Sequence, residues 1–216
     1  MIDTRERLLQ AAEQSYARFG FEGTSLRALT AAAGVNLAAV NYHFGSKRGL
    51  LMEMSRRIVD PINRERLELL AHARQETPAG PLSLEVIFEA FMRPVARYAS
   101  IDGKPNLIFL RLIGRFMAES GDFYHEVVDT LFRDVADAFL KELGQTLPQL
   151  SPAELRLRFH FALSSMLGAL SQYHRIERGL CAGFDISDIT GLLDRLRDFI
   201  CAGFRGSVPV AGKEGA

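Results

Sequence analysis

The chain has 216 residues, of which 48% are hydrophobic and 24% charged, and its 26 basic side chains balance 26 acidic ones. This composition is ordinary for a soluble globule, and the length is enough to bury a sizeable core. The two cysteines, Cys181 and Cys201, have neither paired nor metal-like spacing, so we expect no disulfide framework and no zinc site.

The start of the chain, MIDTRERLLQ, is charged from its third residue, and no later apolar run reaches about 18 residues. We therefore expect a cytoplasmic protein without a membrane segment. A first helix is predicted after Asp3, which forms a capping-box pattern with Glu6, and it should end at Gly20. Its inward face is marked by Leu8, Ala12, Ser15, Tyr16 and Phe19.

The next stretch, residues 24–51, holds two short helical patterns that meet at Gly34. Thr24 or Ser25 can cap the first pattern, and Gly34 supplies a left-handed turn residue. Asn36 can cap the second, which is barely two turns long and turns Val40 and Phe44 inward. This arrangement predicts a helix-turn-helix whose second helix enters DNA.

The charge around this stretch also favours a polyanionic partner. No acidic residue lies between Glu22 and Glu53, whereas Arg27, Lys47 and Arg48 fall inside that window. Electrostatic attraction supplies most non-specific DNA affinity, and acidic side chains would oppose it. The predicted DNA-contacting residues are Thr24, Ser25, Arg27, Asn36, Leu37, Ala38, Ala39, Asn41, Tyr42, His43 and Lys47.

These residues have different expected roles. Ala38 and Ala39 allow close approach to the groove, and Asn41 can bond an adenine edge. Tyr42, His43 and Lys47 are types that reach phosphates. The alternatives are that Tyr42 is a core aromatic and that His43 only caps its helix.

The sequence from Tyr42-His43-Phe44 through Gly45-Ser46-Lys47 to Leu50-Leu51 resembles the DNA-binding domain of the TetR family of bacterial transcriptional regulators. The string 35–44 is similar to that of members that control fatty-acid metabolism. Departures from the commonest family pattern at Thr30, Leu37, Ala38 and Asn41 leave the operator sequence open. The resemblance implies nine helices, three plus six, and a dimer that is most often a repressor.

The remaining chain is predicted to be helical throughout. Ser46 should cap a long helix that Pro61 bends or deprives of one hydrogen bond, and a Pro- and Gly-containing linker follows at 75–83. The predicted helices after residue 45 are 46–74, 84–99, 106–118, 123–143, 152–178 and 187–204. We thus predict an all-α protein with a helix-turn-helix DNA-binding domain (1–47), a six-helix ligand-binding and dimerisation domain (48–204) and a disordered tail (205–216).

No catalytic or cofactor motif is present, so an enzyme is disfavoured and no cofactor is expected. The predicted helix 106–118 is apolar almost all round, yet it carries Arg111 and Arg115 one turn apart. These arginines either pair with acids such as Glu119, Asp122 or Glu126, or line a solvated edge, or form an anion-binding corner of a ligand pocket. The predicted pocket residues are Phe88, Phe91, Phe109, Arg111, Arg115, Phe116, His160, Phe161, Ser164 and Tyr173.

The last two predicted helices carry more apolar positions than one buried stripe needs, and the first of them also has a run of small residues. They predict a four-helix dimer interface, with an ordinary monomer core as the alternative.

The preferred function is a homodimeric transcriptional repressor released from a palindromic operator by a small apolar or anionic ligand, such as a fatty acid or acyl-CoA. The alternatives are a xenobiotic-responsive repressor of an efflux pump, and an all-helical small-molecule-binding protein or enzyme that does not bind DNA.

Overall fold

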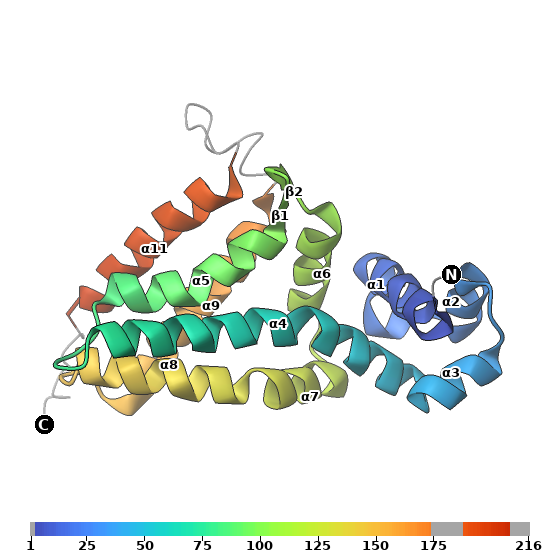
Figure 1. Cartoon of the computed structure of the whole chain (residues 1–216), viewed down its shortest axis with the longest axis horizontal. Coiled ribbons are helices and arrows are strands. Elements are labelled where there is room, and N and C mark those ends of the chain that lie inside the picture. Colours follow the sequence, from blue (N-terminus) through green and yellow to red (C-terminus); the bar gives the residue numbers. More distant parts are fainter. Residues whose placement is uncertain (1–2, 174–187, 208–216) are drawn as a thin grey trace, which may run out of the picture.

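The computed structural model describes residues 3–173 and 188–207, in which helices joined by loops form all the regular structure apart from one short hairpin (Figure 1). The predicted all-α class is thereby confirmed. The helices are α1 (Thr4–Gly23), α2 (Leu26–Ala33), α3 (Leu37–Phe44), α4 (Lys47–Glu76), α5 (Leu84–Ala99), α6 (Leu107–Met117), α7 (Asp122–Leu131), α8 (Arg133–Thr146), α9 (Pro152–Ser171) and α11 (Ile189–Arg205). None of these helices combines the length and the apolar character that a membrane span requires.

The predicted helix 123–143 is in fact two helices, α7 and α8, that meet at Phe132. Neither glycine nor proline marks the junction. It is instead supported from α4, where the buried Asn63 donates a hydrogen bond from Nδ2 to the carbonyl of Leu131 at 2.6 Å. The partner of this junction thus lies 68 positions away in the chain.

The predicted break between α5 and α6 contains a two-stranded antiparallel hairpin, β1 (Ser100–Ile101) and β2 (Lys104–Pro105). Its turn residues Asp102 and Gly103 both have positive φ, at 51° and 72°. Asp-Gly is a common pair in two-residue hairpin turns, so the sequence held a signal that the helical reading missed.

The 30-residue helix α4 joins the three N-terminal helices to the rest of the molecule (Figure 1). As predicted, Ser46 is its N-cap, and Ser46 Oγ accepts a hydrogen bond from the amide of Gly49 at 3.0 Å. Pro61 lies inside the helix without ending it. At about 1.5 Å per residue, a helix of this length spans roughly 45 Å and reaches most of the way along the molecule.

Two apolar clusters form the interior. The first surrounds α1, α2, α3 and the start of α4, and it also contains Leu112 of α6 with Phe123 and Val127 of α7. The second is built from the remainder of α4 and from α5, α6, α8, α9 and α11. Partly buried Ile58 of α4 packs against both. The N-terminal helices are therefore packed onto α6 and α7 as well as onto α4.

A buried cation, Arg66 of α4, lies between α4 and α5. Its Nε donates to the carbonyl of Phe91 at 2.8 Å, its Nη1 donates to Oδ1 of Asn63 at 3.0 Å, and its guanidinium lies 4.0 Å from the centre of the Phe91 ring. Burial lowers the pKa of Arg66 to about 9, which leaves it protonated at neutral pH. Through Asn63, this group ties α5 to the junction of α7 and α8.

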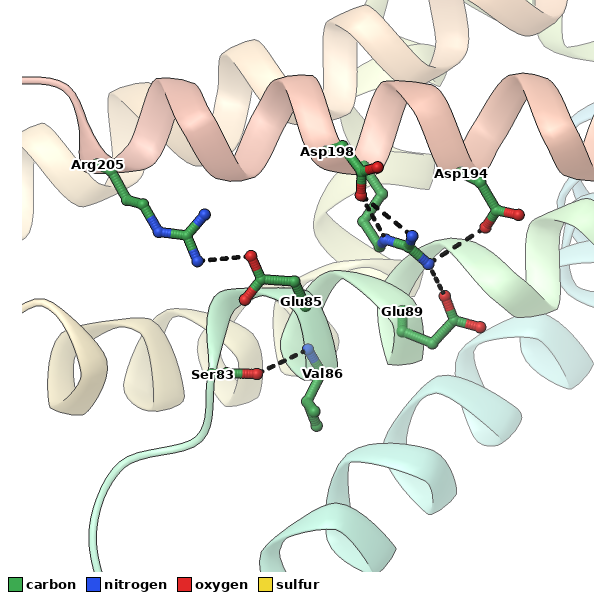
Figure 2. Close-up of polar contacts among 8 residues, drawn as sticks. Ser83, Glu85, Val86, Glu89, Asp194, Asp198 and Arg205 are labelled. Atoms are coloured by element: carbon green, nitrogen blue, oxygen red, sulfur yellow. Dashed lines mark hydrogen bonds and ion pairs between the residues drawn. The ribbon is translucent and has the colours of Figure 1, made fainter.

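Helix α11 is fixed along α5 by an apolar seam with charged edges. The rings of Phe88 and Phe204 lie 5.0 Å apart in the seam. At one edge Glu85 accepts from Arg205 at 2.5 Å, and Arg197 bonds Glu89, Asp194 and Asp198 at 2.7 to 3.2 Å (Figure 2). Exposed pairs of this kind contribute little stability each, so the apolar seam supplies most of the attachment.

Candidate DNA-binding interface

The turn between α2 and α3 has the geometry predicted for a helix-turn-helix. Gly34 ends α2 in the left-handed conformation, with φ 63° and ψ 38°, and the amide of Val35 donates to the carbonyl of Thr30 at 3.0 Å. Asn36 caps α3, with its Oδ1 accepting from the amide of Ala39 at 3.0 Å. Ser25 caps α2 through a longer contact of 3.5 Å.

Helix α3 buries one side and presents the other to solvent. Val40 is completely buried against the first apolar cluster. Tyr42 is 85% exposed and Leu37 51% exposed, which excludes the core alternative for Tyr42. Ala38 and Asn41 are also exposed, while Ala39 and His43 are half-buried. The outward face of α3 therefore consists of residues that were predicted to contact DNA.

The structure places several other predicted contacts differently. The Thr24 side chain is buried, and its Oγ1 donates to the carbonyl of Gly20 at 2.6 Å, so it holds the end of α1 rather than facing outward. Lys47 is half-buried, with Nζ 3.4 Å from the carbonyl of Glu22 and 4.7 Å from the centre of the Phe21 ring. Ser25, Arg27 and Asn36 are exposed.

Arg48, the third cation of the acid-free window, is directed toward α7. It forms an ion pair with Glu126 and donates to the carbonyl of Asp122 at 3.3 Å. Glu126 neutralises the charge of Arg48. Because both partners are more than 70 residues away in the chain, this pairing was not visible in the local charge pattern. Among the described residues, Arg27 and Lys47 are the cations of the window that form no ion pair.

The first turn of α4 approaches the end of α3 closely. A Cβ atom added to Gly49 would overlap the carbonyl oxygen of Phe44, which is backbone and has little freedom to move. Gly49 therefore fixes the angle at which α4 leaves the helix-turn-helix. Glycine is favoured at position 49 for this steric reason and not for its backbone conformation, because Gly49 does not have a positive φ.

The predicted ligand pocket is not assembled as one cavity. Phe88, Phe91, Phe109 and Tyr173 are buried within the second cluster, where Phe91 packs against Phe139 and Phe159 at 5.1 and 5.2 Å between ring centres. Phe116 instead packs against the first cluster beside Tyr124 and Phe132. On α9, Phe161 is 57% exposed, His160 is exposed, and half-buried Ser164 lies 3.5 Å from His160. Helical periodicity indicated apolar faces but not the partner of each face.

Arg111 and Arg115 do lie together, on the edge of a groove of about 300 Å³ between α1, α6 and α9. Arg115 does not pair with an acid within the described residues. Its Nη2 donates to the carbonyl of Arg18 in α1 at 2.6 Å. None of the roles predicted for Arg115 from sequence included this bond to the N-terminal helices.

A second contact between α1 and the end of α6 lies next to the first. Glu119 accepts a hydrogen bond from the amide of Phe21 at 2.8 Å. This amide follows Gly20, whose φ of 69° kinks α1 where the sequence predicted its end, and a Cβ there would overlap the Glu119 carboxylate. Gly20 therefore serves both the kink and the close approach of α6.

Two family descriptions match this chain. Residues 8–54 match "Bacterial regulatory proteins, tetR family", and residues 89–203 match "Tetracyclin repressor-like, C-terminal domain". The chain belongs to the TetR family. Its members are DNA-binding transcriptional regulators rather than enzymes, and they bind operators and small-molecule effectors and form dimers.

Individual relatives with similar sequences are also transcriptional regulators. The chain is 26% identical over 157 residues to the transcriptional repressor AcnR of Corynebacterium glutamicum, covering 66% of this chain and 82% of AcnR. It is 52% identical over 49 residues to the regulatory protein RaaS of Mycobacterium tuberculosis, 23% of each chain.

Solved structures of the TetR family share the fold. The fatty acid degradation regulator FadR from Bacillus halodurans aligns with a TM-score of 0.63 at 12% identity, over 96% of this chain and 99% of FadR. The regulator PfmR from Thermus thermophilus aligns with a TM-score of 0.57 at 18% identity, over 91% of this chain and 97% of PfmR.

Replacing Gly49 tests the close packing of α4 on α3. Helix propensity alone favours alanine over glycine by up to about 1 kcal/mol, so the overlap with Phe44 must reverse the sign. We expect Gly49→Ala to lower the free energy of unfolding by roughly 1 to 3 kcal/mol in urea titrations. The matched control is Gly144→Ala in α8, where the added Cβ meets Leu155 at an ordinary 3.7 Å and stability should stay or rise. Equal stability of the two variants would contradict this account.

Proposed function

We propose that the chain is a homodimeric repressor that inserts α3 of each subunit into the major groove of a palindromic operator. The observation that carries this proposal is the outward face of α3, which is held by Val40 and the Asn36 cap and yet leaves Tyr42 85% exposed. A short helix with a free polar and aromatic face beside a cationic rim fits the width of a major groove.

The proposed contacts fall into two groups. Ala38, Ala39 and Asn41 face the base edges, where an asparagine can form two bonds to adenine. Ser25, Arg27, Tyr42, His43 and Lys47 contact phosphates and fix the register without reading sequence. Asn36 and Leu37 lie at the start of α3, beside both groups. We place the DNA-binding domain at 1–47 and the ligand-binding and dimerisation domain at 48–204, and residues 208–216 of the expected tail lie outside the described residues.

The proposed dimer interface is formed by α9 and α11. Leu157 and Phe161 of α9 are 47% and 57% exposed, and Phe199 of α11 is 71% exposed. Since α11 is already attached to α5 along its other side, these side chains are free to pack against a second copy. Residues 174–178 and 187 of the two predicted interface helices lie outside the described residues.

A salt titration of dimer and monomer tests the assembly. Phe199→Asp should give a monomer in sedimentation and a lower operator affinity. A plot of the logarithm of the binding constant against the logarithm of the salt concentration falls with a slope of about 0.9 per neutralised phosphate. A monomer carries one helix-turn-helix instead of two, so its slope should be about half that of the dimer. Ile101→Asp, at a 57% exposed position in the hairpin, is the matched control and should remain dimeric. A monomeric wild type, or a flat salt dependence, would disprove the proposal.

The division of roles on α3 can be tested by affinity for a set of operator variants. Tyr42→Ala should weaken binding to all sequences by a similar factor, because a phosphate contact carries no sequence information. Asn41→Ala should relax the preference at one base pair per half-site, at a cost of about 1 to 3 kcal/mol there. An unchanged preference profile for Asn41→Ala would show that Asn41 does not read a base.

For the effector, we propose an anionic apolar molecule such as a fatty acid or acyl-CoA, supported by the adjacent Arg111 and Arg115 at a groove with apolar walls. The second candidate, a xenobiotic-responsive repressor of an efflux pump, would favour cationic drugs. Palmitoyl-CoA should release the purified protein from its operator, whereas the lipophilic cation tetraphenylphosphonium should not. Release by the cation alone would reverse the assignment.

A further inference from the structure

We infer that the groove between α1, α6 and α9 is the site where a carboxylate-bearing amphiphile binds, and that its head group competes with α1 for Arg115. The groove has a volume of about 300 Å³ and is lined in part by Ala17, Leu107, Leu110, Arg111, Arg115 and Leu170. This is at the small end of the range for ligand sites, which start at about 300 Å³. The inference rests on the proposed function and locates its effector at a surface between the two apolar clusters, not within the second cluster.

The lining combines the two features that such an amphiphile requires. Leu107, Leu110 and Leu170 offer apolar walls, and Leu107 remains 42% exposed, so a hydrocarbon chain laid against it would bury surface that is now in water. Gly114 and Ser171 also line the groove, and a Cβ on Gly114 would come into van der Waals contact with the Ser171 side chain at 3.4 Å.

The charge of the groove selects an anion. Arg111 is exposed and, among the described residues, forms no hydrogen bond or ion pair. Arg115 uses Nη2 for the Arg18 carbonyl, and a guanidinium has five N–H donors. Two guanidinium groups one helical turn apart can share one carboxylate through charge-assisted bonds, whereas a cationic amphiphile would be repelled.

The position of Arg115 connects this groove to the N-terminal helices α1 to α3. Its bond to Arg18 and the bond from Phe21 to Glu119 hold α1 on α6, and α1 packs against α2, α3 and α4 in the first cluster. To present its remaining N–H donors to a carboxylate held by Arg111, the Arg115 guanidinium would have to turn toward Arg111, and this turn would break its bond to the Arg18 carbonyl. Because the ligand then binds better when the α1–α6 contact is open, it must favour the state in which α1 is released.

Direct binding to the full-length protein without DNA tests the site. Dodecanoate is the probe, titrated by calorimetry below its micelle concentration, and dodecyltrimethylammonium is the matched chain of opposite charge. We expect dodecanoate to bind, the cation not to bind, and Arg111→Ala to lower dodecanoate affinity about tenfold or more, as expected for one charge-assisted bond of about 1.5 to 3 kcal/mol. Arg111→Lys should recover part of the loss.

Two further variants separate the groove from general effects. Ala118→Leu extends an exposed lining residue into the groove and should weaken binding while the protein stays folded. Arg93→Ala removes an exposed arginine of α5 that does not line the groove and should bind dodecanoate like the wild type. Equal affinity of Arg111→Ala, Ala118→Leu and Arg93→Ala would overturn the inference, as would equal binding of both detergents.

Methyl NMR gives the location independently. Dodecanoate should shift the methyl signals of Leu107 and Leu170 and leave those of Leu143, which is fully buried in the second cluster, in place. Shifts confined to Leu143 and its neighbours would place the ligand in the core and refute the groove. Since no DNA is present in these measurements, a protein that failed to bind an operator could still confirm or refute the groove.

Discussion

The fold of the N-terminal unit depends on one constraint, which is that a helix of eight residues is not stable alone in water. Helix α3 is held because Val40 is fully buried, Asn36 satisfies an amide at its start, and Gly49 lets α4 reach its last carbonyl. All of this support comes from the inner side and the two ends. The outer side is thereby left to polar, small and aromatic residues, which is the condition for a helix that must fit into a groove.

The N-terminal helices also depend on packing against the rest of the molecule. A cluster of α1, the two eight-residue helices α2 and α3 and one end of α4 offers limited buried surface, and here it is completed by Leu112, Phe123 and Val127 from α6 and α7. The polar contacts at this border are of two kinds. The Arg48–Glu126 pair is exposed on both sides and contributes little, whereas the bonds from Arg115 and to Glu119 meet backbone groups at the Gly20 kink.

Local chemistry was predictable from sequence, and long-range pairing was not. The caps at Ser25, Asn36 and Ser46 and the turn at Gly34 each involve residues within five positions, so their signals are complete in a short window. The junction of α7 and α8 accepts a hydrogen bond from Asn63, 68 positions away, and the Arg115–Arg18 bond joins residues 97 apart. Nothing near Phe132 or Arg115 in the chain carries that information.

The predicted pocket failed for a related reason. Periodicity assigned Phe88, Phe116 and Phe161 to apolar faces, but these faces meet three different surroundings: the second cluster, the first cluster and solvent. The pairing of Arg111 with Arg115 was predicted correctly because it is set by helix geometry alone, one turn apart on α6. The sequence could not show that Ala17 of α1 lines the space beside these arginines. The groove of about 300 Å³ therefore lies at the border between the two clusters.

The energies at this border are of the size that regulation needs. Allosteric coupling between two sites is typically about 1 to 3 kcal/mol, and one hydrogen bond to a charged group is worth roughly 1.5 to 3 kcal/mol. Exchanging the Arg115–Arg18 bond for a bond to a ligand carboxylate therefore changes the stability of the α1–α6 contact by a comparable amount. A larger and more apolar interface would resist such a change. The apolar contacts of Leu112 and Phe123 alone would hold the N-terminal helices in place whether or not a ligand were bound. The border thus combines apolar residues that keep the N-terminal helices folded with one cation, Arg115, whose bond to α1 we propose a ligand carboxylate replaces.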